Sequence, residues 1–170
     1  PSSAASDVYK RQSFVKDRDQ YFLEKVKGKS VLHIGACNSP ETQMQIDNKL
    51  LLHSKLSEQS KDCLGIDICR ESIEIMKKNN ITNVIFCDIE NIESLDKKFD
   101  IVIMGEVIEH LNNVGLALEN IQKVLNKNGE LLISTPNLFS FYWLVGNIKN
   151  YEAFNSCLLY TSPSPRDLDL

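Results

Sequence analysis

The residues of this chain best suited to chemistry follow a strongly apolar stretch. Residues 101–104 form an unbroken apolar run, and Glu106, Glu109 and His110 come next at the helical spacing i, i+3, i+4. Runs that are apolar on both faces are typical of central parallel strands, and open α/β sheets bind ligands at the carboxyl ends of such strands. The histidine there suits a general base near neutral pH. The structural alternative is an ordinary strand-to-helix junction with a solvated acidic face.

Three earlier strand ends carry residues suited to a nucleoside. Gly35, Asp67 and Asp88 each follow a short apolar run, and the second run lies about 30 residues after the first, as a βαβ unit requires. Gly35 allows a ligand to approach the backbone closely. Asp67 can accept both ribose hydroxyls, and Asp88 can accept from the exocyclic amine of adenine. Each residue alone is explained by a turn or a helix cap, but the ordered set predicts a nucleoside site.

On these residues the chain resembles the class I S-adenosylmethionine-dependent methyltransferases, over roughly residues 14–150. The likeness is greater to bacterial members with a VLHIG strand and a GEVIEHL segment, several of which lie among glycan-biosynthesis genes. The resemblance implies S-adenosyl-L-methionine as cofactor and a small-molecule or glycan acceptor methylated at oxygen. Because histidine suits a general base for a hydroxyl acceptor, His110 is the candidate catalytic residue. The cofactor-binding residues it implies are His33, Gly35, Ala36, Cys37, Asp67, Ile68, Asp88, Ile89, Gly105 and Glu106.

The chain departs from the family pattern in its first motif. The family usually has an acid at the position of His33 and further glycines at the positions of Cys37 and Ser39. The contact from this loop to the methionine ammonium is therefore left without a matching residue.

Three other interpretations stay open. Glu106, Glu109 and His110 also match the metal-binding helix of ubiquinone-pathway and small-RNA 2′-O-methyltransferases, but no histidine follows His110 as a further ligand, so we expect no metal. An NAD(P)-dependent oxidoreductase would use the same strand-acid pair, but it requires a full G-x-G-x-x-G, which residues 35–40 do not supply. A non-catalytic nucleoside-binding module would keep the core and lose the cofactor residues, three of which are present.

The apolar pattern predicts alternating helices and strands. The expected helices span residues 14–27, 46–58, 71–78, 114–125 and 138–148, the strands 30–34, 62–66, 83–87, 100–104 and 130–135, with a short turn at 92–95. This alternation predicts an α/β, Rossmann-like three-layer sandwich with a parallel sheet, corresponding to strands one to five of the methyltransferase fold without its last two. We expect His53 to be structural, and Tyr142 and Trp143 to belong to the core more readily than to an acceptor pocket.

The sequences at the two ends of the chain are not typical of native protein. Residues 7–12 and 157–162 are what the two complementary strands of a transposon mosaic end would encode, and their flanks fit sequencing-adapter arms. We therefore expect residues 1–12 and 157–170 to be adapter-derived. Residues 13–156 are then one C-terminally truncated methyltransferase domain, a size that suits a single core.

The composition limits the kinds of partner and environment that we expect for this chain. The net charge is −4, so no basic surface argues for a nucleic-acid substrate. No apolar run approaches the roughly 18–20 residues of a membrane span. The cysteines outside the predicted adapter ends form no CxxC pair, which favours free thiols in a reducing cytoplasm. The oligomeric state is not predicted.

Overall fold

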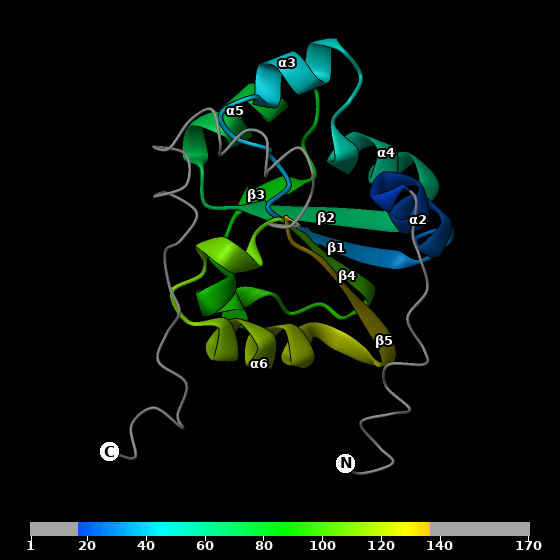
Figure 1. Cartoon of the computed structure of the whole chain (residues 1–170), viewed down its shortest axis with the longest axis vertical. Helices are drawn as coiled ribbons and strands as arrows, with labels where there is room; N and C mark the ends of the chain where they lie inside the picture. Colours follow the sequence, from blue (N-terminus) through cyan, green and yellow to red (C-terminus); the bar gives the residue numbers. More distant parts are fainter. Residues whose placement is uncertain (1–16, 137–170) are drawn as a thin grey trace, which may run out of the picture. The chain divides into compact units, whose positions relative to one another are not determined.

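The computed structural model describes residues 17–136, apart from the side chains of residues 93 and 94. The elements in chain order are α2 (Arg18–Lys25), β1 (Ser30–Ile34), α3 (Thr42–Asp47), α4 (Leu52–Gln59), β2 (Asp62–Asp67), α5 (Arg70–Lys78), β3 (Val84–Phe86), η1 (Ile89–Ser94), β4 (Phe99–Gly105), η2 (Ile108–His110), α6 (Val114–Val124) and β5 (Leu125–Ser134). All strand pairs are parallel, in the order β3-β2-β1-β4-β5 (Figure 1). The predicted α/β fold with a parallel sheet is confirmed.

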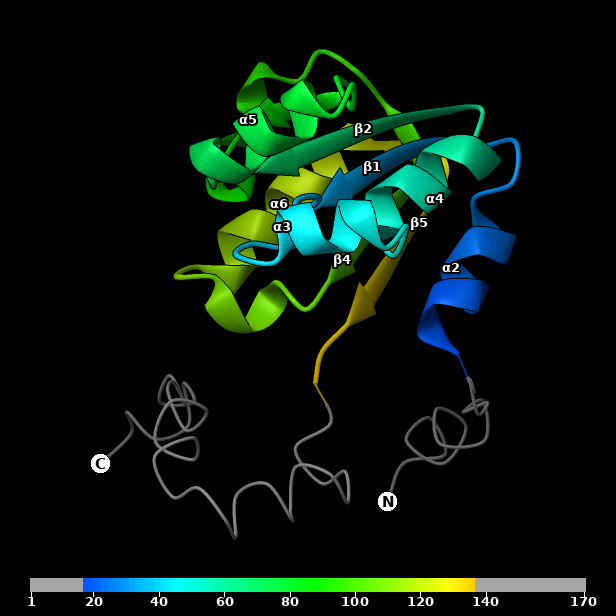
Figure 2. The same cartoon turned by 90° about the horizontal axis from the view of Figure 1, so that it is seen from above.

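Helices cover both faces of the sheet (Figures 1 and 2). Side chains alternate along a strand, so neighbouring residues of β1 and β4 enter different cores. Val31 and Ile101 pack with α2 and α4 on one face, whereas Leu32 and Val102 pack with η1 and α6 on the other. The central strands are therefore buried on both sides, which explains their unbroken apolar runs.

The helix expected over residues 46–58 is wrong, because the structure has two shorter helices, α3 and α4. Lys49 has a left-handed φ of 56°, and the amide of Leu50 donates back to the carbonyl of Gln45 at 2.8 Å, which closes α3. The run of leucines suggested one continuous helix. In the fold it is divided, with Leu50 51% exposed and Leu51 buried at the start of α4.

The last strand also begins earlier than predicted. The sequence predicted a helix to residue 125 and a strand from residue 130, but β5 starts at Leu125, directly after α6. Leu125 pairs with Phe99 and Glu130 pairs with Ile101, so the extra residues between them form an irregularity in the register. At Gly129 an added Cβ would lie 3.1 Å from the carbonyl oxygen of Phe99, so a side chain here would be tightly packed against β4.

Several predictions lie outside the described residues. They are the start of the first helix, the helix over residues 138–148 with Tyr142 and Trp143, and the adapter origin of residues 1–12 and 157–170. Among the described helices, none is long and apolar enough to cross a membrane.

Candidate active site

The candidate site lies at the carboxyl ends of β1 and β4, where the strand order reverses. The chain runs outward from β1 to β2 and β3, and then returns to place β4 on the other side of β1. Ile34 pairs with Met104 at this edge, so the loops after the two strands begin side by side. A reversal of this kind is where open α/β sheets bind ligands.

The loop after β4 explains why a glycine occupies position 35. The φ of Gly35 is 74°, and a Cβ at this position would stand 2.5 Å from Cγ2 of Val107. Its own amide and that of Ala36 both donate to the carbonyl of Ile66. The absent side chain therefore lets the loops after β1 and β4 meet.

Asp67 ties this loop to the beginning of α5. One of its carboxylate oxygens accepts the amide of Cys37 and the other accepts the amide of Cys69, both at 2.9 Å. An ionised carboxylate has about four acceptor positions, so each oxygen keeps capacity for one further donor. Burial, followed by the nearby Asp67 carboxylate, raises the pKa of the Cys37 thiol, which therefore stays protonated.

Apolar surface suited to a nucleobase lies beside the Asp67 carboxylate. Ile68, the next residue, is 69% exposed at the end of β2. Asp88 follows β3 and accepts the amide of Glu90 at 2.9 Å, so it caps η1, while Ile89 is buried beneath it. An acceptor pair with an adjacent exposed apolar side chain fits the ribose and one face of adenine.

An ion pair that the sequence did not reveal lies at the same edge. The guanidinium of Arg18, the first residue of α2, contacts the carboxylate of Glu106 at 2.5 Å. Glu106 has a left-handed φ of 54° and its amide donates to the carbonyl of Ser134 at 2.8 Å. The hydroxyl of Ser134 is buried with no hydrogen-bond partner in the described part of the chain. Sequence reasoning missed Arg18 because nothing local links it to a residue 88 positions away.

His33 lies in the core and not at the surface. It is 4% exposed, and its Nδ1 lies 3.3 Å from Nδ1 of His53 on α4. The ring centroids are 5.5 Å apart with the planes 12° from parallel, so the rings meet through their nitrogen edges. Burial lowers the pKa of His33 well below 6.5 and that of His53 to about 4. Both rings are neutral at pH 7, and the predicted structural role of His53 agrees with its full burial.

The expected helical face of Glu106, Glu109 and His110 does not form. The helical segment here is the three-residue η2, and Glu106 precedes it with a left-handed backbone. All three side chains are exposed. Within residues 17–136, no group of three His, Cys, Asp or Glu side chains is placed to hold a metal ion. His110 ends η2, in the segment after β4, as a single exposed imidazole.

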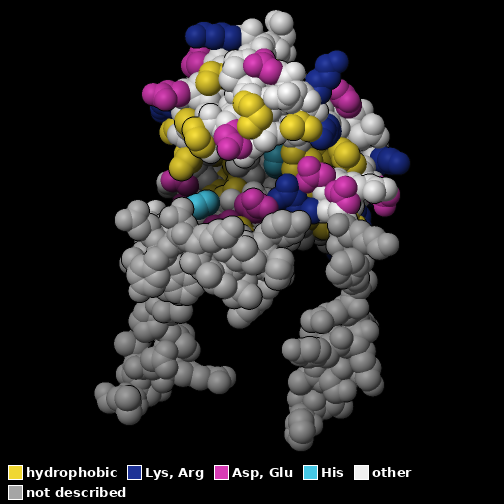
Figure 3. All heavy atoms as spheres, turned by 45° about the horizontal axis from the view of Figure 1, so that its top comes forward, with side chains coloured by type: hydrophobic (Ala, Val, Ile, Leu, Met, Phe, Trp, Pro, Cys, Tyr) yellow, Lys and Arg dark blue, Asp and Glu magenta, His cyan; other side chains and the backbone are white. Residues whose placement is uncertain are grey.

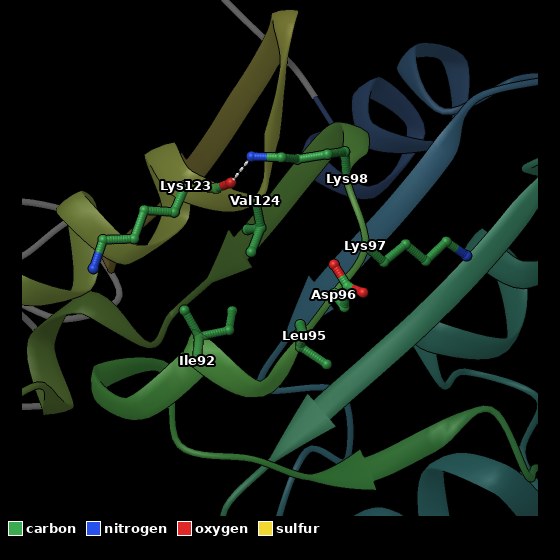
Figure 4. Close-up of a pocket in the computed structure, with 7 residues that line it drawn as sticks. All are labelled: Ile92, Leu95, Asp96, Lys97, Lys98, Lys123 and Val124. Atoms are coloured by element: carbon green, nitrogen blue, oxygen red, sulfur yellow. Dashed lines mark hydrogen bonds between the residues drawn. The ribbon is translucent and has the colours of Figure 1, made fainter.

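A separate cavity of about 380 Å³ lies at the amino-terminal ends of the strands, near the start of β4 (Figure 4). Its lining residues are Ile92, Leu95, Asp96, Lys97, Lys98, Lys123 and Val124. The amines of Lys97 and Lys123 point away from the cavity, whereas that of Lys98 extends toward the carbonyl of Lys123 (Figure 4). Lys97 pairs with Asp62, and Lys98 donates to the carbonyl of Lys123. This cavity is remote from the groups described above.

Charged side chains of both signs are mixed on the face of the described residues that Figure 3 shows. Lysine and arginine side chains are interspersed there with acidic and apolar ones.

The sheet order, the reversal point and the carboxylates at the strand ends define a Rossmann-like nucleoside-binding domain. A family model described as a methyltransferase domain matches residues 25–162, which extends past the boundary predicted at residue 156. The chain therefore belongs to the class I S-adenosylmethionine-dependent methyltransferases.

Curated relatives carry the name ubiquinone biosynthesis O-methyltransferase. The protein of Rickettsia typhi is 31% identical over 136 residues, which cover 77% of this chain and 53% of the relative. The protein of Rickettsia akari is 38% identical over 92 residues, covering 51% of this chain and 36% of the relative. The chain spans about half the length, or less, of these relatives.

Solved structures share the fold at low identity. A Thermotoga maritima methyltransferase, described as a possible histamine N-methyltransferase, aligns with a TM-score of 0.55 and 20% identity, covering 79% of this chain and 59% of its own. The N-methyltransferase NodS of Bradyrhizobium japonicum, solved with S-adenosyl-L-homocysteine, aligns with a TM-score of 0.51 and 21% identity, covering 68% and 59%. At these identities the likeness concerns the fold alone.

Proposed function

We propose that the protein spanned in part by this chain transfers a methyl group from S-adenosylmethionine to an oxygen atom of a small-molecule acceptor in the cytoplasm. The accepting oxygen is supported by the relatives named as O-methyltransferases. A glycan acceptor is the narrower form of this proposal, supported by the resemblance to enzymes encoded among glycan-biosynthesis genes. The observation that carries the cofactor assignment is the Asp67 carboxylate, which two backbone amides hold at the reversal point of the sheet.

The nucleoside half of the cofactor would lie along the ends of β2 and β3. Asp67 would accept the ribose hydroxyls with its remaining acceptor positions. Ile68 would cover one face of the adenine, with Asp88 accepting from the exocyclic amine and Ile89 supporting the ring from below. The loop of Gly35, Ala36 and Cys37 would contribute shape more than donors, because all three amides already have partners.

The amino-acid half would lie between the ends of β4 and α2, beside Gly105. It carries one carboxylate and one ammonium group, and Arg18 and Glu106 offer one cation and one anion at this edge. Charge complementarity favours an exchange in which Arg18 binds the carboxylate and Glu106 the ammonium. This pairing supplies the ammonium contact that the loop after β1 lacks.

Bound S-adenosylmethionine supplies a methyl group already activated by its sulfonium, so the chain mainly aligns the acceptor. His110 is exposed in the segment after β4, and its imidazole would take the proton of the acceptor hydroxyl. We propose that no metal takes part, since Glu106 and Glu109 do not share a helical face with His110.

Calorimetric titration with S-adenosyl-L-homocysteine tests the cofactor assignment. Asp67→Ala should weaken binding at least about tenfold, because it removes charge-assisted hydrogen bonds to the ribose. Asp96→Ala is the matched control, since it removes an exposed acid near the amino-terminal ends of the strands. Circular dichroism should verify that both variants are folded. Unchanged affinity in a folded Asp67→Ala variant, or binding of NADH in place of the homocysteine compound, would overturn the proposal.

A further inference from the structure

The turn that carries the adenine residues is tied directly to the segment that follows His110. η1 begins at Ile89, directly after Asp88, and the side chain of the next residue, Glu90, leaves this turn. A single oxygen, Oε1 of Glu90, accepts the amide of Asn112 at 2.9 Å and the amide of Asn113 at 3.1 Å. One carboxylate thus joins the loop after β3 to the loop after β4.

Asn112 and Asn113 are solvent-exposed, and the Glu90 carboxylate is the acceptor that the fold gives to both of their amides. Asn113 is the N-cap of α6, and its side chain accepts the amide of Leu116 at 3.0 Å. Amides at and before a helix N-terminus have no intrahelical acceptor. A carboxylate forms a charge-assisted hydrogen bond with them, which is stronger than a bond to a neutral acceptor. Glu90 supplies this acceptor from a different element, so the start of α6 depends on the position of η1.

The backbone at the start of η1 is held by the same helix. Asn120 on α6 is 1% exposed, and its side-chain amide donates to the carbonyls of Ile89 at 3.1 Å and Glu90 at 3.0 Å. Ile89 belongs to one apolar cluster with Ile121 of α6 and with Leu111, which directly follows His110. η1 and the segment around His110 therefore pack as one unit against α6.

The contacts of η1 with α6 are important because few other contacts fix the part of the fold that would bind the adenine. β3 has only three residues and lies at the edge of the sheet, paired on one side to β2. Edge strands of this length have few hydrogen bonds to fix them. The position of Asp88 therefore rests on η1, and the position of η1 rests on its bonds to α6 and to the segment after His110.

We propose that Glu90 is a positioning residue that couples occupation of the adenine side of the site to the position of His110. This inference rests on the proposed function, because it takes the cofactor to bind at Asp88 and Ile89. A cofactor that fixes η1 also fixes the acceptor for the Asn112 and Asn113 amides, and so orders the segment that carries His110. Coupling of this kind is reciprocal, so loss of the Glu90 contact also weakens cofactor binding.

Nuclear magnetic resonance of the histidine side chains tests the coupling on the 170-residue chain. The chain has three histidines, and His110 is the exposed one, so its imidazole signals can be assigned against the buried pair. In the wild type, S-adenosyl-L-homocysteine should shift the His110 signal to saturation. In Glu90→Ala, affinity should fall roughly tenfold, and the His110 shift at saturation should fall to less than half.

Two further variants separate positioning from general loss of structure. Glu90→Gln keeps a side-chain oxygen for the two amides and should retain affinity within about threefold together with most of the His110 shift. Glu119→Ala removes an exposed acid from α6 and should behave as wild type. A Glu90→Ala variant that shows the full His110 shift at saturation would overturn the coupling.

A second measurement requires no variant. In the wild type, saturating S-adenosyl-L-homocysteine should slow hydrogen exchange of the Asn112 and Asn113 amides at least about fivefold, because exchange reports local opening. Exchange that is unchanged while the ligand binds would overturn the coupling and leave the proposed function standing. A wild type that binds no S-adenosyl-L-homocysteine would instead refute the proposed function itself.

Discussion

Acidification is expected to destabilise this domain through the buried pair of His33 and His53. Both rings are neutral in the fold, because burial lowers the pKa of His33 well below 6.5 and that of His53 to about 4. In the unfolded chain both histidines take up a proton near pH 6.5. Below that pH the unfolded state binds more protons than the folded state, so the free energy of unfolding falls as the pH falls.

The size of the effect follows from the interval between the two pKa values of His53. Each pH unit within it costs about 1.4 kcal/mol, so the interval from 6.5 to about 4 corresponds to roughly 3 kcal/mol. His33 contributes with the same sign, and the neighbouring Arg18 opposes its protonation further. Because domains of this size are stable by only about 5–15 kcal/mol, the loss should be easily measured.

Urea denaturation at a series of pH values between 7.5 and 4.5 measures this loss. The midpoint should fall steadily below pH 6.5 with little change in the slope m. Hydrogen bonding to Lys97 lowers the pKa of Asp62 and a backbone hydrogen bond from Ser30 lowers that of Asp100, so these acids affect stability only at lower pH. The part of the window above about pH 5 therefore reports mainly the histidines.

Two variants identify the pair as the source. Replacing both buried histidines, in a His33→Leu, His53→Leu double variant, should flatten the pH profile, whereas His110→Ala should leave its slope intact because that ring is exposed. A wild-type profile that is flat from pH 6.5 to 4.5, or a double variant as acid-sensitive as the wild type, would refute the reasoning.

Three further outcomes are expected. Gly35→Ala should destabilise the fold by about 1–3 kcal/mol in urea denaturation, since its Cβ would meet Val107 at a left-handed φ, and Val107→Ala should restore the steric part of this loss. Arg18→Ala should weaken binding of S-adenosyl-L-homocysteine roughly tenfold with little change in melting temperature, because its ion pair with Glu106 is exposed. In an intact relative, alanine at the position of His110 should slow methyl transfer by roughly 10²–10⁴ while a chelator changes nothing.

Much of the architecture was predictable from local pattern. Strands buried on both faces have continuous apolar runs, so Ser30–Ile34 and the strand before Glu106 were located within a residue at either end. Alternation of such strands with helices leaves a parallel sheet as the natural arrangement. The acids at the strand ends, Asp67 and Asp88, followed from the same reasoning, because their positions relative to the strands are local.

Local sequence patterns could not predict the contacts between residues that lie far apart in the sequence. The conformation of Glu106 is left-handed and its partner is Arg18, so helical spacing placed it on a face that does not exist. The ring of His33 turns toward α4 because β1 alternates its side chains between two cores, and His53 meets it there. Which residues stand at strand ends follows from the local sequence, because the apolar pattern of a strand lies within its own residues. Which of these residues meet follows from the fold, because it depends on strand order and on how the chain bends after each strand.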